Sequence, residues 1–209
     1  KLNEVGIKSN FINGLRVTDK NSINIVEDVL INFNKEIIES LKKNLCESQS
    51  ITSKENNILI VEQENKELGF VGTPIEINLS IIDQIVRDKK VPVIAPLGLD
   101  ENHQVYNINA DTVAGSIAKK LNARRLIIMS DVEGVLNDNK KLISEINTDE
   151  VNNLIKCGTI NGGMIPKIKN CLDVANNGVK GVCIIDGRLE HSILFELLSN
   201  AGSGTLIRE

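Results

Sequence analysis

The sequence predicts an α/β fold, a three-layer sandwich whose open central sheet is mainly parallel. Apolar, β-branched runs alternate with amphipathic helical stretches along all 209 residues, and this alternation is typical of parallel strands joined by helices. Several of the runs, including residues 91–95, are continuously apolar, which is typical of strands buried on both faces. No internal repeat or low-complexity linker interrupts the pattern in the sequence.

Residue spacing defines the elements of the first half. After Thr18 and Asp19, which form an N-cap pair, apolar residues recur near helical period as far as Leu41. The elements that follow are a strand at 58–61, a hairpin at 68–77 (with Gly69, Gly72 and Pro74), a helix at 80–88 and a strand at 91–95.

The second half repeats the alternation of strands and helices. The expected elements are a turn at 100–103, a short strand, a helix at 109–121, a strand at 126–129, a helix opening at Thr148, a helix at 164–176 and a strand at 182–185. Gly178 follows the helix at 164–176, where a glycine readily adopts the left-handed conformation that ends a helix.

Composition excludes several classes of function. The net charge is −4 without a run of clustered cations, so nucleic acid is not an expected partner. No apolar run approaches the roughly 20 residues needed to cross a bilayer. The four cysteines are widely separated and there are only two histidines, which argues against a resident metal site and favours reduced, buried thiols.

Three polar residues of the first half are candidates for a site that binds an anionic ligand, either by direct contact or by orienting other groups. Arg16 stands just before a capped helix, where its guanidinium could fork onto a carboxylate. Asn107 ends a strand that feeds a helix, and backbone N–H groups at a helix start favour anions. Asp111, in the first turn of that helix, could orient cationic side chains around a phosphate. The alternatives are a surface arginine in a turn and an acid that only complements the helix dipole.

Two segments of the second half suggest a phosphate site. Ser130 and Asp131 directly follow a strand, and ligands of open α/β sheets collect at the carboxyl ends of strands, although an ordinary turn is an equal explanation. Gly162 and Gly163 precede a helix whose Lys167 could neutralise charge on a transferring phosphoryl group. The alternative is a Gly-Gly turn followed by a solvated lysine. Neither a P-loop nor a Rossmann glycine motif is present in the sequence.

Six segments, in this order along the chain, together resemble the acetylglutamate kinases of the amino acid kinase family. They are Asn-Gly-Leu-Arg-Val-Thr-Asp (13–19), Leu-Gly-Phe-Val-Gly (68–72), Tyr-Asn-Ile-Asn-Ala-Asp (106–111), Ser-Asp-Val-Glu-Gly-Val-Leu (130–136), Gly-Gly-Met-Ile-Pro-Lys (162–167) and Ile-Ile-Asp-Gly-Arg (184–188). The segments span nearly the whole chain, and their shared order is far more specific than any one of them.

The resemblance implies a phosphotransferase that moves the γ-phosphoryl group of ATP onto the γ-carboxylate of N-acetyl-L-glutamate. Residues 1–123 would bind acetylglutamate and residues 124–209 would bind ATP, with Mg²⁺ as the bridging ion and no resident metal site. Arg16 and Asn107 would hold the substrate, Asp111 would organise the catalytic lysines, and Lys167 would stabilise charge on the phosphoryl group. The residues bordering the nucleotide would be Ser130, Asp131, Gly134, Thr159, Asn161 and Gly163.

The C-terminal stretch is similar to the tail of arginine-inhibited members of the family. There Arg125, His191, Glu196 and Gly202 would form a feedback site for arginine, and the alternative is an ordinary final amphipathic helix. The resemblance also implies a homo-oligomer, either a dimer or a hexamer, and the nitrogen-signalling PII protein as a partner. Cytosol and plastid stroma both suit the unpaired thiols.

The sequence departs from the family pattern at its start. An early Lys-x-Gly-Gly strand and a glycine-rich substrate loop, which should precede Lys1, are not in this sequence, so this chain alone is expected to be nearly inactive. Two other functions remain as alternatives. One is a sibling kinase acting on aspartate, glutamate, carbamate or a nucleoside monophosphate, and the other is a non-catalytic module that binds arginine or PII.

Overall fold

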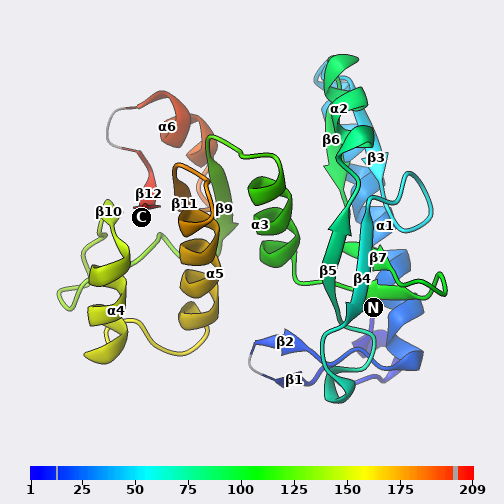
Figure 1. The fold of residues 1–209 in the computed structure, drawn as a ribbon, viewed down its shortest axis with the longest axis horizontal. Coiled ribbons are helices and arrows are strands. Elements are labelled where there is room, and N and C mark those ends of the chain that lie inside the picture. The colour runs from blue at the N-terminus through cyan, green and yellow to red at the C-terminus, as the bar shows by residue number, and fades with distance from the viewer. Residues whose placement is uncertain (13, 200–201) are drawn as a thin grey trace. The chain divides into compact units, whose positions relative to one another are not determined.

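The computed structural model describes residues 1–12, 14–199 and 202–209, and the chain forms two compact units, Lys1–Val113 and Ala114–Glu209. Helix α3 (Ala110–Lys120) contains the boundary between the units. Asn13, the first residue of the motif at 13–19, lies outside the described residues. Figure 1 shows the α/β architecture of each unit, and the assignment of substrate and nucleotide to residues 1–123 and 124–209 remains a prediction.

Among its described residues, the first unit combines one long helix and one shorter helix with three small sheets. Its elements are β1 (Phe11–Ile12), β2 (Leu15–Arg16), α1 (Lys20–Lys43), β3 (Ser48–Ile51), β4 (Leu59–Gln63), β5 (Gly72–Ile77), α2 (Leu79–Arg87), β6 (Val91–Ile94), β7 (Leu97–Leu99) and β8 (Val105–Asn107). Short 3-10 helices occupy Asn3–Val5 and Lys66–Leu68. Strands β3 and β6 pair in parallel, β1 and β2 are antiparallel, and the remaining strands form a mixed sheet in the order β5-β4-β7-β8.

Helix α1 begins where the sequence predicts, because Asp19 caps it. The Asp19 carboxylate accepts hydrogen bonds from the backbone N–H groups of Asn21 (3.0 Å) and Ser22 (2.8 Å). The Ser22 hydroxyl also donates to this carboxylate, which is the largest of the effects that lower the pKa of Asp19. The cap supplies partners for N–H groups that a helix start leaves unsatisfied. It therefore fixes the point at which the chain leaves the Arg16 segment and enters the helix.

Two expectations for the first unit are wrong. Residues 68–77 are not a hairpin by themselves, since β5 pairs antiparallel with β4 instead. Gly69 has a φ of +71°, and a Cβ on it would lie 2.4 Å from the Thr18 carbonyl oxygen, so this glycine serves a close backbone approach. Strand β6 is not buried on both faces: Val91 is 44% exposed, and among the described strands only β3 pairs with β6.

The second unit has one mixed sheet with helices packed against it. Its further elements are β9 (Leu126–Ser130), β10 (Glu145–Ile146), α4 (Thr148–Lys156), α5 (Met164–Asn176), β11 (Val182–Asp186), α6 (Ser192–Leu198) and β12 (Gly204–Ile207). The strand order is β10-β12-β11-β9, with β9 parallel and β12 antiparallel to β11. Parallel and antiparallel pairs thus coexist in both units, and the predicted α/β class is confirmed.

The core of the second unit is built on β11 and α5. All five residues of β11 are buried, as the sequence predicts for a strand covered on both faces. The α5 side chains Ile168 and Val174, both 0% exposed, belong to the same apolar cluster as Ile184. Strand β9 is less buried than expected, since it ends the sheet among the described strands and its Met129 is 52% exposed.

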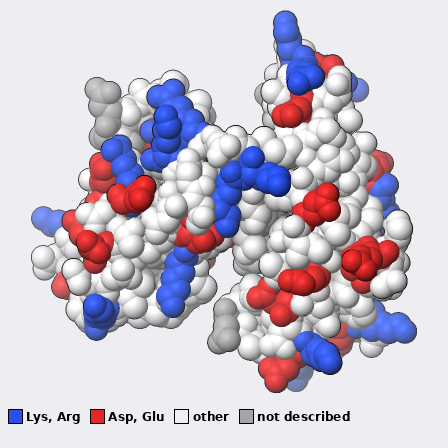
Figure 2. Space-filling view, viewed as in Figure 1, with Lys and Arg blue, Asp and Glu red and all other residues white. Residues whose placement is uncertain are grey.

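The distribution of charge on the surface agrees with the sequence, in which basic residues are not clustered. Acidic and basic side chains are interspersed over the face of each unit that Figure 2 shows. No helix within the described ranges combines the length and apolar character required to cross a membrane.

Candidate functional site

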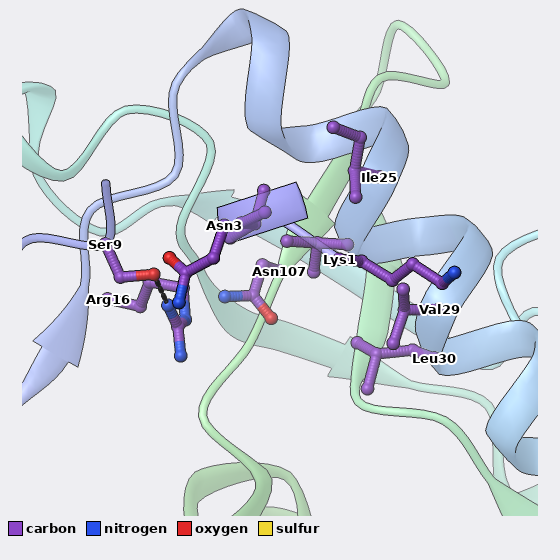
Figure 3. Close-up of a pocket in the computed structure, with 10 residues that line it drawn as sticks. Lys1, Asn3, Ser9, Arg16, Ile25, Val29, Leu30 and Asn107 are labelled. Atoms are coloured by element: carbon purple, nitrogen blue, oxygen red, sulfur yellow. Dashed lines mark hydrogen bonds between the residues drawn. The ribbon is translucent and has the colours of Figure 1, made fainter. Parts of the chain in front are cut away.

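A cavity of about 400 Å³ in the first unit brings Arg16 and Asn107 together. Arg16 ends β2 and Asn107 ends β8, and both side chains point into the same space in Figure 3. Helix α1 contributes an apolar wall that includes Ile25, Val29 and Leu30. This volume suits a small-molecule ligand. The lining combines the cations Arg16 and Lys1, the amides Asn107 and Asn3 and an apolar wall, which suits a carboxylic acid with a hydrocarbon part.

Neighbouring side chains hold the Arg16 guanidinium in place. One guanidinium nitrogen (Nη1) donates a hydrogen bond to the Ser9 hydroxyl, which also lines the cavity. The guanidinium carbon lies 4.7 Å from the centre of the Phe11 ring, within the range of a cation–π contact. Because two groups restrict it, the guanidinium loses less freedom when it binds a carboxylate.

Asn107 is anchored through both its backbone and its side chain. Its backbone N–H donates to the Phe70 carbonyl (2.9 Å), and its side-chain Nδ2 donates to the Thr18 hydroxyl (3.3 Å). Asn109, two residues on, accepts from the Thr112 N–H (3.1 Å) and so helps to start α3. Asp111 lies in the first turn of that helix, as the sequence predicts, and is half-buried.

In the second unit, the nucleotide candidates Ser130 and Asp131 lie where β9 ends. Ser130 pairs in register with Asp186, the last residue of β11, and the Gly187 N–H donates to the Ser130 carbonyl (2.8 Å). The carboxyl ends of two parallel strands therefore meet at this edge, which is where open α/β sheets bind ligands. The sequence predicts that Ser130 and Asp131 follow a strand, as they do here. It does not predict that Asp186 lies beside Ser130 at the end of the neighbouring strand.

Gly134 belongs to the same edge, where close packing requires a glycine. Its φ is +143°, and a Cβ would lie 2.5 Å from the Thr205 hydroxyl oxygen. That hydroxyl accepts from the Val135 N–H (2.8 Å) and donates to the Ile143 carbonyl (2.7 Å). The glycine thus lets the loop after β9 lie directly on β12.

The second nucleotide candidate segment leads into α5. The Thr159 hydroxyl donates to the Asp138 carboxylate (2.5 Å), and the Asn161 amide donates to the Gly158 carbonyl (3.0 Å). Gly163 is the N-cap of α5 without a side-chain capping bond, and a Cβ on it would meet nothing within 4 Å. Open space around an uncapped helix start is compatible with a phosphate ligand. Lys167 lies in the first turns of α5 and is half-buried.

Cys157 is an exposed thiol beside this segment. Its sulfur lies 3.2 Å from the Thr159 hydroxyl oxygen, and this hydrogen bond is the main cause of its lowered pKa. Cys183 contrasts with it, because burial raises the pKa of that thiol to about 12, with a further contribution from a hydrogen bond to Glu196. Cys157 is accordingly the more reactive of these two thiols.

A second cavity, of about 380 Å³, collects three of the four residues predicted for arginine binding. Arg125, Glu196 and Gly202 all line it, and an Arg125 guanidinium nitrogen (Nη1) lies 3.5 Å from Glu196 Oε1. Gly202 has a φ of +69°, and a Cβ on it would lie 2.8 Å from Glu196 Oε2. His191 is not among the described residues that line this cavity; it is exposed and stands at the start of α6.

Sequence reasoning missed several residues around these cavities. Ser9 and Phe11 hold Arg16, and Thr18 contacts Asn107. Glu145 and Arg208, which form an ion pair at 3.3 Å, also line the cavity of the second unit. The sequence signals only some of them by position: Thr18 lies within the motif at 13–19, and Ser9 and Phe11 lie a few residues before Arg16.

Within the described residues, no group of three or more His, Cys, Asp or Glu side chains could hold a metal ion by itself.

The fold and these cavities are those of an α/β protein with sites for small molecules, and comparison with known proteins identifies it as a kinase and gives its family. The amino acid kinase family matches residues 1–186, and the chain belongs to this family. It is 69% identical, over 209 residues, to the acetylglutamate kinase of Pelagibacter ubique (strain HTCC1062), covering 100% of this chain and 73% of that protein.

A less similar relative and a solved structure also match nearly the whole chain. The chain is 43% identical to the acetylglutamate kinase of Caldanaerobacter subterraneus subsp. tengcongensis, over 99% of this chain and 71% of that protein. Among solved structures, it is similar to smu.665 from Streptococcus mutans UA159, with a TM-score of 0.86 and 30% identity. That comparison covers 99% of this chain and 80% of the Streptococcus chain.

Proposed function

We propose that this protein phosphorylates the γ-carboxylate of N-acetyl-L-glutamate with ATP, the acetylglutamate kinase reaction of arginine biosynthesis. The observation that carries the proposal is the convergence of Arg16 and Asn107 on one cavity, in a chain 69% identical to an acetylglutamate kinase. Arg16 supplies a fixed cation for one substrate carboxylate, and Asn107 supplies an amide for the polar groups beside it.

The nucleotide is assigned to the second unit. Ser130, Asp131 and Gly134 lie at the sheet edge, while Thr159, Asn161 and Gly163 lead into α5. Lys167, on α5, is the cation assigned to the phosphoryl group, and Asp111 is assigned the orientation of the catalytic lysines. Fixed charges that meet developing charge account for most of the catalysis expected of such a site.

The proposed cofactors are ATP and Mg²⁺. Membership of the amino acid kinase family supports both, and Mg²⁺ would arrive with the triphosphate because it usually binds phosphates with few protein ligands. When bound, Mg²⁺ would neutralise phosphate charge. The residues of this chain would then bind the carboxylate, orient the nucleotide and exclude water from the acyl phosphate product.

The test is an assay of the full-length protein with ATP, Mg²⁺ and acetylglutamate. Hydroxylamine traps an acyl phosphate as a coloured hydroxamate, and release of ADP is followed in parallel. Formation of both products in equal amounts is the expected result. ATP turnover without hydroxamate, or no turnover, contradicts the proposal.

A substrate panel addresses the sibling kinases. Aspartate, glutamate, carbamate and a nucleoside monophosphate replace acetylglutamate in the same assay. The proposal requires kcat/KM to be highest with acetylglutamate. A higher value with any other acceptor would reassign the enzyme within the family.

We also propose that arginine regulates the enzyme through the cavity of the second unit. The Glu196 side chain is 8% exposed and offers a carboxylate to a guanidinium or amine. The Ser203 backbone N–H fixes one oxygen of this carboxylate, Oε2, by a hydrogen bond of 3.0 Å.

Assembly as a dimer or hexamer, binding of PII, involvement of His191 and a plastid location remain predictions. If arginine binds but the full-length protein has no kinase activity, the non-catalytic regulatory module becomes the better explanation.

A further inference from the structure

Thr18 lies at the junction of three segments behind the first cavity. Its backbone N–H donates to the Leu68 carbonyl (2.9 Å), and its carbonyl accepts from the Phe70 N–H (2.7 Å). Val71, just beyond, forms a parallel bridge with Asn107. The segment that carries Arg16 and the strand that carries Asn107 are therefore joined through residues 68–71. Thr18 itself is 0% exposed.

The Thr18 hydroxyl adds a direct link between the two functional segments. It donates to the Arg16 carbonyl oxygen (3.2 Å) and accepts from Asn107 Nδ2 (3.3 Å). The directions follow from chemistry, because a carbonyl oxygen can only accept. The hydroxyl proton is therefore used on Arg16, and only the lone pairs of the hydroxyl remain for Asn107.

This polarity decides how the Asn107 amide is turned. Because the lone pairs of the Thr18 hydroxyl face Asn107, the Asn107 amide must direct its NH₂ group toward Thr18. In the opposite orientation Oδ1 of Asn107 would face the hydroxyl oxygen of Thr18, and both atoms would be acceptors. Oδ1 is consequently directed away from Thr18, as a fixed acceptor. Both hydrogen bonds of the Thr18 hydroxyl form in only one orientation of the Asn107 amide, so the buried hydroxyl selects that orientation.

We propose that Thr18 is a positioning residue for the acceptor-substrate cavity: its buried hydroxyl sets the orientation of the Asn107 amide and ties it to the Arg16 segment. The inference rests on the proposed function of that cavity, because its consequence is measured as substrate affinity. Thr18 is not itself among the described residues that line the cavity, so it acts through Asn107 and Arg16.

The test uses the full-length protein with the substitutions Thr18→Val and Thr18→Ser. Valine keeps the shape and the backbone bonds of Thr18 but removes the hydroxyl, whereas serine keeps the hydroxyl. We expect Thr18→Val to raise KM for acetylglutamate about three- to tenfold, the size of one lost hydrogen bond, while KM for ATP changes less than twofold. Thr18→Ser is expected to restore KM for acetylglutamate to near the original value.

Thr52→Val is the matched control. Thr52 is also buried, at 3% exposure, and its hydroxyl accepts from the Lys54 and Glu55 N–H groups of a local turn. KM for acetylglutamate should not rise in this variant, although its unfolding temperature falls. The comparison separates loss of any buried hydroxyl in this unit from loss of the hydroxyl that faces Asn107.

Three kinetic results would overturn the proposal. The first is an unchanged KM for acetylglutamate in Thr18→Val. The second is an equal rise in both KM values, which indicates a general structural role. The third is failure of serine to rescue. If Thr18→Val does not fold, Thr18→Ala replaces it, and failure of both to fold also assigns a purely structural role. Lack of acetylglutamate turnover in the unsubstituted protein refutes the proposed function instead.

Discussion

The Arg188 guanidinium binds the Asp186 carboxylate through two hydrogen bonds, from Nε at 2.8 Å and from Nη2 at 2.7 Å. The Arg188 backbone N–H adds a third bond at 2.9 Å. Asp186 is 2% exposed and lies in register with Ser130, so this ion pair braces the sheet edge that carries the nucleotide candidates. The Arg188 side chain is the principal reason why the pKa of Asp186 falls to about 2.

This ion pair predicts a specific loss of stability in acid. Because the pKa of Asp186 is lower in the folded protein, its stabilising contribution is present above the unfolded pKa, near 4, and disappears as the pH falls toward 2. Denaturant unfolding at pH 4, 3 and 2 should give a steeper fall for the unsubstituted protein than for Asp186→Asn, which cannot titrate there. Asp83→Asn, at an exposed site on α2, is the control and should keep the steep fall. Parallel pH profiles for Asp186→Asn and the unsubstituted protein would contradict the prediction.

Arg16→Lys tests the guanidinium in the first cavity. Lysine keeps the charge but loses the planar fork and the stacking on Phe11, so we expect KM for acetylglutamate to rise about tenfold or more. KM for ATP should stay within about twofold, since one lost carboxylate contact affects the acceptor alone. Steady-state kinetics of Arg87→Lys, an exposed arginine of the same unit, provides the comparison. A KM for acetylglutamate equal in all three proteins would remove Arg16 from the site.

Lys167→Ala tests the cation on α5. An interaction that is stronger in the transition state than in the ground state affects kcat more than KM, and we expect kcat to fall about 100-fold or more. The neighbouring Lys169→Ala, exposed on the same helix, should change kcat by less than about twofold. Comparable kcat values for the two variants would refute the assignment of Lys167.

Glu196→Gln tests arginine regulation. Glutamine keeps the shape of the side chain and an acceptor for the Ser203 N–H, but it removes the charge that would bind a guanidinium. The ratio of rates measured with and without arginine should therefore approach one in this variant. Exposed Glu190→Gln serves as the control and should remain inhibited to the same extent as the unsubstituted protein. Persistent inhibition of Glu196→Gln would exclude this carboxylate as an arginine ligand.

The two thiols with shifted pKa values predict an alkylation pattern. Iodoacetamide at neutral pH should label Cys157, which is exposed and has a lowered pKa, well before buried Cys183, whose pKa is about 12. If Thr159 borders the nucleotide, ATP should slow the labelling of Cys157, as measured by peptide mass spectrometry. Equal labelling rates with and without ATP would separate this segment from the nucleotide site.

Local sequence features predicted most elements of the fold. Asp19 begins α1 as expected, and α5 spans the residues that its apolar period indicates. The predicted hairpin at 68–77 was wrong because its glycines were interpreted as turn residues. Gly69 instead allows the Thr18 backbone to approach, a contact between segments far apart in the sequence. Such contacts leave no local signal.

The candidate sites were only partly visible in the sequence. Arg16 and Asn107 were proposed separately, and their common cavity depends on how β2 and β8 are placed in the first unit. The supporting partners Ser9, Phe11 and Thr18 were not proposed, since a hydroxyl or ring near a motif is chemically ordinary until its neighbours are known.

The sequence by itself determined the α/β class, the order and type of most elements, and the motifs that indicate the amino acid kinase family. These properties depend on residue type and spacing along the chain, which are local quantities. Only the tertiary structure decided that the Thr18 hydroxyl faces Asn107, and that Arg125 shares a cavity with Glu196 and Gly202. Hydrogen bonds and ion pairs require atoms within about 3–4 Å, and the folded backbone alone brings side chains distant in sequence to that separation.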